Sequence, residues 1–122
     1  MKIEKFEDLD GWKKARELAN LIYDLTNQRS FAKDFQLRDQ MRDAAGSVMH
    51  NIAEGFDSGS DAEFVRFLKI SRRSSSEVQS ELYLAVDRRY ISENQLGKAY
   101  AKATETKRLI NGLIAYLHRN KK

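Results

Sequence analysis

Residues 92–119, SENQLGKAYAKATETKRLINGLIAYLHR, contain the pattern that decides the fold. Apolar or small side chains recur there at alternating spacings of three and four residues, the spacing of a seam between nearly parallel helices. They are Leu96, Ala99, Ala103, Thr106, Ile110, Leu113 and Leu117. Ser92 and Gln95 precede them with the spacing of a capping box, which satisfies free N–H groups at a helix start. The stretch therefore predicts a helix over residues 93–119.

The residues before this stretch predict a second long helix, over residues 61–89. Ser60 and Glu63 form another capping-box pattern at its start. The predicted inward face mixes apolar and hydroxyl side chains: Phe64, Phe67, Leu68, Ser71, Ser75, Val78, Leu82, Ala85 and Val86. The small side chains in the middle of this face leave room for a neighbouring helix to approach closely.

The first half of the chain predicts two more helices, over residues 9–28 and 34–54. The inward face of the second consists of Leu37, Met41, Ala44, Ala45, Val48, Ile52 and Ala53. Gly55 stands where a left-handed residue would end that helix. Four helices joined by short links predict an all-α fold, an antiparallel up-down-up-down four-helix bundle. One domain would span residues 1–122, with residues 1–8 as an extended N-terminal segment.

Helix 9–28 is apolar around an unusually large part of its circumference. Its apolar side chains cover an arc of roughly 200°, about twice the stripe that one core contact needs. One interpretation is contact with a second copy of the chain. The leucines proposed for that interface are Leu18, Leu21 and Leu25. The alternative is a rim of leucines partly covered by the stems of Lys14 and Arg16.

The chain of 122 residues contains no cysteine and no proline. The absence of proline favours long uninterrupted helices. The absence of cysteine excludes disulfides, iron–sulfur clusters, thiolate zinc sites and cysteine nucleophiles. No apolar run is long enough for a membrane span, and the N-terminus lacks the apolar core of a signal peptide. We therefore expect a cytoplasmic protein without membrane contact.

The net charge of +4 is unevenly distributed along the chain. Residues 91–122 contain seven basic and two acidic side chains, whereas the rest of the chain is nearly neutral. The basic residues are Lys98, Lys102, Lys107, Arg108, Arg119, Lys121 and Lys122. This excess favours an anionic partner, RNA or DNA, bound through its phosphates. The alternative interpretation is a helix face that serves solubility alone.

The two histidines, His50 and His118, do not fit the catalytic patterns of helical bundles. Neither follows a glutamate at a distance of three residues, as di-iron bundles require. Arg42 is the nearest candidate partner of His50, but eight positions place the two about 80° apart around a helix. We therefore predict no enzymatic activity, no metal and no cofactor. A hydrolytic role in RNA processing that depends on His50 is a third alternative.

Several motifs resemble one known family. They are Asp8-Leu9-x-x-Trp12-x-x-Ala15, Gln40-Met41-Arg42-x-Ala44-Ala45-x-Ser47-Val48, Asn51-Ile52-Ala53-Glu54-Gly55, Glu63-Phe64-x-Arg66-Phe67-Leu68 and Ser74-x-x-Glu77. Over nearly the whole chain, these motifs resemble the four-helix-bundle proteins encoded by intervening sequences of bacterial large-subunit ribosomal RNA genes. The chain departs from the usual pattern at Arg73, where a small residue is common, and at Asp43, where a basic residue is common.

This resemblance implies a cytoplasmic bacterial protein, an antiparallel four-helix bundle and a ring-shaped homopentamer. It also implies a likeness to the accessory proteins of diversity-generating retroelements, basic barrels that assist a reverse transcriptase with its nucleic acid. No enzymatic activity is established for the family. In a ring of five chains, a charge of +4 per chain would become about +20.

The motifs contain a set of residues that we expect to have structural roles. This structural signature is Trp12, Arg42, Asn51, Glu54, Gly55, Arg66, Ser74 and Glu77. Glu54 is expected to pair with Arg42 or Arg66, or to accept hydrogen bonds from the start of the next helix. Glu77 is expected to pair with Arg72 or Arg73. Such pairs would fix helix register rather than act in catalysis.

Two hypotheses for function follow from the sequence. The first is a non-enzymatic homo-oligomer that binds RNA or DNA electrostatically through its basic last helix and tail. The second is a protein-interaction adaptor or scaffold, in which the apolar first helix docks a partner protein without direct nucleic-acid contact.

Overall fold

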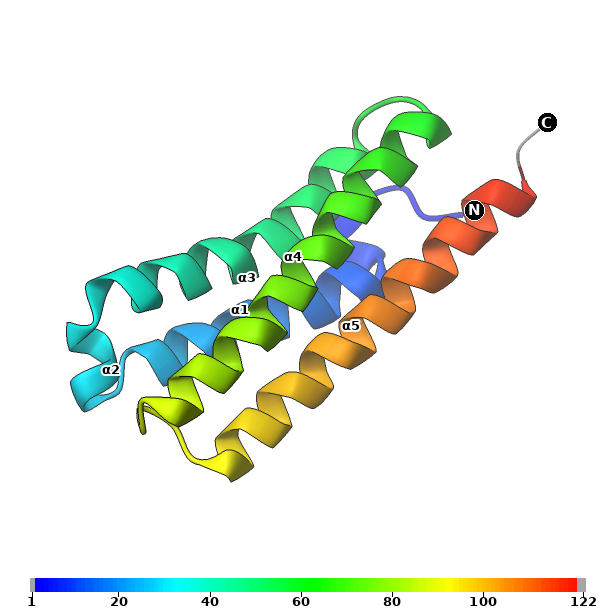
Figure 1. Cartoon of the computed structure of the whole chain (residues 1–122). Helices are drawn as coiled ribbons and strands as arrows, with labels where there is room; N and C mark the ends of the chain where they lie inside the picture. Colours follow the sequence, from blue (N-terminus) through cyan, green and yellow to red (C-terminus); the bar gives the residue numbers. More distant parts are fainter. Residues whose placement is uncertain (1, 121–122) are drawn as a thin grey trace.

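The computed structural model describes residues 2–120, and every regular element in that range is helical. The four long helices are α1 (Asp10–Thr26), α3 (Phe35–Phe56), α4 (Asp61–Asp87) and α5 (Glu93–Arg119), and two short ones are the 3-10 helix η1 (Phe6–Asp8) and α2 (Arg29–Lys33). Figure 1 shows the long helices running alongside one another, with α2 at one end of the bundle. The predicted all-α fold is confirmed, and each long helix lies within two residues of its predicted bounds.

The long helices pack as antiparallel neighbours. α1 packs against α3 and α5, and α4 packs against the same two helices from the other side. Between α1 and α5, Lys14 pairs with Glu105 while Glu17 pairs with Lys102, so residue numbers rise on one helix as they fall on the other. The order of the helices is therefore the predicted up-down-up-down order.

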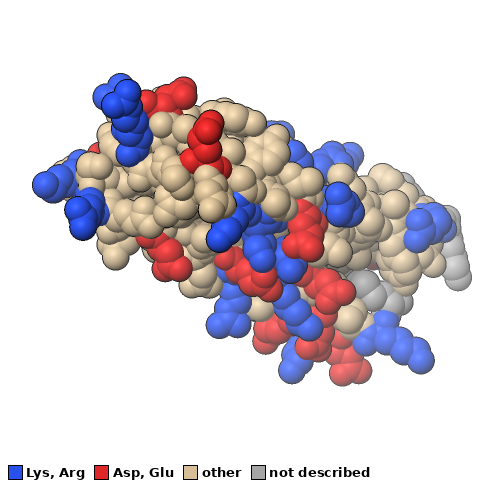
Figure 2. Space-filling view, turned by 90° about the horizontal axis from the view of Figure 1, so that it is seen from below, with Lys and Arg blue, Asp and Glu red and all other residues tan. Residues whose placement is uncertain are grey.

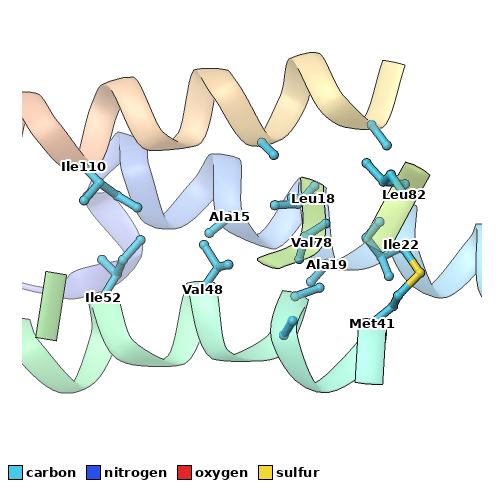
Figure 3. Close-up of a cluster of buried hydrophobic side chains, with 14 of the residues drawn as sticks. Ala15, Leu18, Ala19, Ile22, Met41, Val48, Ile52, Val78, Leu82 and Ile110 are labelled. Atoms are coloured by element: carbon cyan, nitrogen blue, oxygen red, sulfur yellow. The ribbon is translucent and has the colours of Figure 1, made fainter. Parts of the chain in front are cut away.

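One continuous cluster of aliphatic side chains from all four long helices forms the core. Figure 3 shows Leu18 and Ile22 of α1 facing Met41 and Val48 of α3, with Ile110 of α5 also pointing inward. All five side chains are at most 1% exposed. Met41, Val48 and Ile110 therefore lie on the inward faces that their spacing predicted.

The predicted oligomer interface on α1 is wrong for two of its three leucines. Leu18 is fully buried and Leu25 is 4% exposed, so neither side chain can touch a second copy of this structure. Leu21 alone is half-buried at the surface. The wide apolar arc has a simpler explanation, since α1 lies between two neighbouring helices and packs against both.

The predicted extended N-terminal segment is also wrong in part. Residues 2–5 precede a 3-10 turn, η1, and Ile3 and Phe6 pack against the core. The ring of Phe6 meets Trp12 edge to face at 5.2 Å. Met1 lies outside the described residues. The segment therefore covers the end of the bundle next to α1.

The structure also contains a helix that the sequence did not predict, α2, in the link between α1 and α3. Phe31 of α2 is fully buried, and its ring stacks on Tyr90 at 5.0 Å. A helix of five residues is too short to show a periodic pattern, so a single buried aromatic anchors it instead.

The two predicted capping boxes have different outcomes. The Ser92 hydroxyl accepts a hydrogen bond from the Gln95 N–H at 3.1 Å, and the Gln95 side-chain oxygen accepts one from the Ser92 N–H at 2.9 Å, so this box is complete. Ser60 accepts from the Glu63 N–H at 3.2 Å. The Glu63 carboxylate, however, receives the Arg66 guanidinium at 3.0 Å, and only half of the second predicted box forms.

The prediction that Gly55 ends its helix is wrong. α3 continues to Phe56, and the left-handed glycine of the following link is Gly59, with φ of 93°. Gly55 is buried against α4, where an added Cβ would lie 2.7 Å from the Phe67 Cβ and 2.9 Å from the Phe64 ring. The glycine is therefore needed for a close approach between α3 and α4 rather than for a turn.

α4 also contains a partly buried carboxyl group, that of Glu81. One of its oxygens is buried and has no hydrogen-bond partner among the described residues. Burial removes water from around the carboxyl group and so disfavours its charged form. This effect, with a smaller contribution from the nearby Glu77 charge, raises the pKa of Glu81 to about 7. Below about pH 7, the Glu81 carboxyl group is therefore mostly neutral in the folded protein.

We predict that Gly55→Ala lowers the free energy of unfolding by about 1–3 kcal/mol, because the new methyl group would overlap Phe67 and Phe64. The matched control is Gly112→Ala, on α5, where an added Cβ meets nothing within 4 Å. That change should stabilise the protein by about 0.5–1 kcal/mol, the usual gain in a helix interior. Urea unfolding measures both, and equal stability of the two variants would contradict the packing role of Gly55.

We predict that the contribution of Glu81 to the free energy of unfolding falls as pH rises from 4.5 through 7. The unfolded chain releases the Glu81 proton near pH 4.5, whereas the folded chain keeps it to about pH 7. At pH 8, Glu81→Gln should therefore raise the free energy of unfolding by about 1–2 kcal/mol. This value is smaller than the pKa shift alone would give, because solvent screens the charge of a half-buried group. The control is Glu54→Gln, at an exposed position on α3. Unfolding curves at several pH values would refute the prediction if both variants responded alike.

Candidate nucleic-acid interface

Three of the seven predicted cations border one hollow beside α5. Lys98, Lys102 and Arg108 line this shallow hollow between α5 and α1, together with the acidic Glu105, and Leu21 of α1 lies in its wall. Lys98 and Lys102 lie about 40° apart around the helix, whereas Arg108 lies about 80° from Lys98 and about 120° from Lys102, so the cations border the hollow from different directions. The structure therefore supports part of the basic surface that the sequence predicted.

The remaining predicted cations do not belong to this hollow. Lys107 lies on the α4 side of α5, where its ammonium group donates to Ser76 at 3.0 Å and to the Gln79 side-chain oxygen at 2.9 Å. Arg119 is exposed in the last turn of α5. Two further predicted residues, Lys121 and Lys122, lie outside the described residues. The basic helix is thus divided between two faces.

An ion-pair network occupies the border between α1 and α5. Lys102 contacts Glu17 at 2.8 Å, and Lys14 contacts Glu17 at 3.4 Å and Glu105 at 3.2 Å. The hydrogen bond that Lys102 donates to Glu17 holds the pKa of Glu17 below its usual value, and the one that Lys14 donates to Glu105 raises the pKa of Lys14. Each pair is partly exposed, so solvent screens its attraction and it contributes little to stability.

This network changes which cations are available to a ligand. Lys102 and Lys14 are balanced by two carboxylates, whereas Lys98 and Arg108 form no ion pair among residues 2–120. Figure 2 shows one face of the molecule, on which basic and acidic side chains are interspersed. Lys98 and Arg108 are therefore the strongest candidates for contact with phosphates.

A second hollow adjoins the first along α1. It shares Leu21 and Lys102 with the first hollow and is further lined by Trp12 and by both basic and acidic side chains. The basic ones are Lys13 and Arg16, and the acidic ones are Glu7, Glu17 and Asp24. The Arg16 guanidinium lies over the Trp12 ring at 5.8 Å. We call the two hollows together the α1/α5 groove.

The cations that α1 contributes to the α1/α5 groove were not predicted from the sequence. Residues 1–28 are nearly neutral as a whole, and this balance hid the local grouping of Lys13 and Arg16. Their spacing of three residues places both on one helix face, and that spacing was the available signal.

Asn51 and Ser74, two residues of the structural signature, join α3 to α4. The Asn51 amide donates to the Ser47 carbonyl at 2.8 Å and to its hydroxyl at 2.9 Å. The Ser47 and Ser74 hydroxyls lie 2.8 Å apart across the two helices. One turn away, Ser71 donates to the Val48 carbonyl at 2.6 Å. These serines are packing and hydrogen-bonding groups, as the predicted close approach of a neighbouring helix requires.

The predicted partners of Glu54 are wrong. Arg42 donates to the buried Thr26 hydroxyl at 2.9 Å and stacks over Tyr23, on the α1 side of α3. Arg66 pairs with Glu63 within its own helix. Glu54 itself is exposed. Arg42 and Glu54 lie in one helix about 18 Å apart along its axis, which is beyond side-chain reach, and Arg66 has a carboxylate one turn away in α4.

The predicted pairing of Glu77 does not form either. Glu77 is exposed, and Arg72 reaches across to α5, where it donates to the Asn111 side chain at 2.7 Å. No salt bridge among the described residues involves Arg73. The charge of Glu77 is the smaller of the two causes that raise the pKa of Glu81.

The structure brings together no group of residues typical of a catalytic or metal site within residues 2–120. His50 on α3 and His118 at the end of α5 are both exposed. Across the described part of the chain, no three histidine, aspartate or glutamate side chains gather as metal ligands would. In the same range, no helix combines the length and the apolar character needed to cross a membrane.

Comparisons with known proteins agree with this fold. A solved structure from Bacteroides thetaiotaomicron, described as a protein of unknown function from the S23 ribosomal protein family, matches with a TM-score of 0.77 and 26% sequence identity. The match covers 85% of this chain and 97% of that one. No curated protein sequence matches. Residues 7–112, most of the chain, match the family model described as 23S rRNA-intervening sequence protein. The chain therefore belongs to the 23S rRNA-intervening sequence protein family.

Proposed function

We propose that this chain is a non-enzymatic, cytoplasmic homo-oligomer, a pentamer, that binds the phosphate backbone of nucleic acid along the α1/α5 groove. The observation that carries the proposal is the convergence of α5 cations with Lys13 and Arg16 of α1 beside the Trp12 ring. Cations along a groove bind phosphates, and an aromatic ring in the same groove offers a face on which an unpaired base stacks.

The identity of the nucleic acid is also part of the proposal. The family name refers to 23S rRNA, and the solved relative from Bacteroides thetaiotaomicron is assigned to a ribosomal protein family. Both agree with RNA as the ligand. Lysine and arginine contacts to phosphates do not read base edges, so binding should depend weakly on sequence.

We predict that the chain binds a generic single-stranded RNA and that affinity falls steeply between about 50 and 200 mM salt, because bound phosphates release counterions. Lys98→Ala combined with Arg108→Ala should weaken binding at least about tenfold and reduce the salt slope by about one to two. Fluorescence anisotropy with labelled RNA and DNA measures both effects.

The matched control removes the same amount of charge elsewhere. Lys69→Ala combined with Arg73→Ala eliminates two exposed cations on α4, outside the groove. Binding by this control variant should stay within about twofold of the unchanged protein. Equal losses in the two double variants, or no binding at low salt, would overturn the groove as the binding site.

The second candidate function is a protein-interaction adaptor or scaffold, and one observation favours it. Tyr83 and Leu84 are adjacent on α4 and are 55% and 49% exposed, and Phe35 at the start of α3 is 63% exposed. Exposed apolar side chains of this size are typical of contact surfaces. Capture of a protein partner that survives Lys98→Ala with Arg108→Ala would favour this function over nucleic-acid binding.

We predict that light scattering finds an assembly of five 14.1 kDa chains, about 70 kDa, at micromolar concentration. Since Leu18 and Leu25 are buried within the monomer, the exposed pair Tyr83 and Leu84 is the better candidate for the contact. Tyr83→Ser combined with Leu84→Ser should therefore shift the assembly towards monomer. A 14 kDa species for the unchanged protein would refute the oligomer.

A further inference from the structure

Two arginines have backbone conformations that L-residues with side chains rarely adopt. Arg29, at the start of α2, has φ of 21°, and Arg89, after the end of α4, has φ of 62°. Among the described residues, they are the only non-glycine residues with positive φ. Such conformations cost energy, and they gather at functional sites, where the side chain compensates for the cost.

Both arginines line the same hollow, although 60 positions separate them in the chain. The α1–α2 connection and the α4–α5 connection lie at one end of the bundle (Figure 1). The hollow between them, which we call the link hollow, is lined by Asn27, Gln28, Arg29, Ser30, Arg89 and Tyr90. It contains no acidic lining residue, so its charged groups are the two guanidinium groups alone.

Folding does not explain the choice of arginine at position 89. The Tyr90 N–H donates to the Ala85 carbonyl at 2.9 Å, and the Arg89 N–H donates to the Val86 carbonyl at 2.8 Å. These two bonds form a Schellman motif, in which the left-handed residue is usually glycine. Glycine at this position would close α4 at a lower energetic cost. The presence of arginine instead of glycine at position 89 therefore has a cause other than the end of α4, and the position of Arg89 in the link hollow supplies one.

The two walls of the link hollow are held against each other by side chains. Tyr90 stacks on the buried Phe31 and donates its hydroxyl proton to Asp34 at 2.8 Å. Gln28 accepts a hydrogen bond from Gln95 of α5 at 3.5 Å. These contacts tie the α1–α2 connection to the α4–α5 connection, so the hollow exists before a ligand enters.

Asp34 is the acidic group next to this hollow, and its charge is already engaged. It accepts hydrogen bonds from the Tyr90 hydroxyl and, at 3.1 Å, from the Leu37 N–H, and these bonds hold its pKa below the usual value. The Arg88 charge adds to this effect. Asp34 stays ionised, and it forms no salt bridge with Arg29 or Arg89.

We propose that the link hollow binds a phosphate group, with Arg29 and Arg89 as its two charged ligands and Asn27, Gln28 and Ser30 as neutral ones. A guanidinium group offers two parallel N–H donors to phosphate oxygens, and two such groups from opposite walls enclose one anion. The side-chain amides and the serine hydroxyl supply further donors. The site is separate from the α1/α5 groove and does not depend on nucleic-acid binding there.

The experiment is an NMR titration of the isotope-labelled full chain with inorganic phosphate, against chloride at the same ionic strength. Phosphate should shift the amide signals of residues 27–30 and 89–90, and chloride should not. Arg89→Gly should weaken phosphate binding at least about tenfold and raise the melting temperature by a few degrees, because glycine suits the left-handed position. A merely structural arginine would not combine a stability gain with a binding loss.

Two further variants complete the test. Arg29→Gly should also weaken phosphate binding, whereas Arg73→Ala, at an exposed position on α4, should leave it unchanged. Absence of phosphate-specific shifts, or unchanged phosphate binding by Arg89→Gly, would overturn the site. Lys98→Ala with Arg108→Ala should leave these shifts intact, so failure of the groove and failure of this site are distinguishable.

Oligonucleotides with and without a 5′-phosphate identify the source of the bound group. Shifts caused by both would support a phosphodiester of the nucleic-acid backbone. Shifts caused only by the 5′-phosphorylated oligonucleotide would support a terminal phosphate, and shifts caused only by inorganic phosphate would support the free anion.

Discussion

The close approach of α3 and α4 is the constraint on which the rest of the bundle depends. Gly55 lacks the Cβ that would overlap Phe67, and the small Ser71 donates directly to the Val48 carbonyl at 2.6 Å. A larger residue at either position would push the two helices apart. Because interiors are close-packed, such a displacement would reach every helix that shares the core.

The opposite border, between α1 and α5, is built differently, and this difference creates the candidate site. Here Lys14, Glu17 and Lys102 join the helices through long, partly exposed side chains instead of small buried ones. Long side chains bridge the surface and leave hollows between them. Cations and Trp12 therefore border open space at α1 and α5, whereas α3 and α4 are joined by buried serines.

Sequence patterns predicted the long helices and part of the site, and the errors have physical causes. The bounds of α5 and the seam through Ala103 and Ile110 were predictable because burial on one helix face imposes a regular spacing. Gly55 was misread because glycine suits both a left-handed cap and a close helix contact. Lys98, Lys102 and Arg108 were predictable as part of a basic helix, but their α1 neighbours were not, since that grouping depends on how two helices are aligned.

The sequence by itself determined which segments are helical, which face of each helix is buried and where the excess positive charge lies. Those properties follow from spacing along one chain and from local capping. Only the tertiary structure decided that Lys102 is paired with Glu17, that Leu18 is buried in the core, and that Arg29 and Arg89 line one hollow. Contacts between distant segments depend on helix register and on the paths of the links, and neither has a local signature.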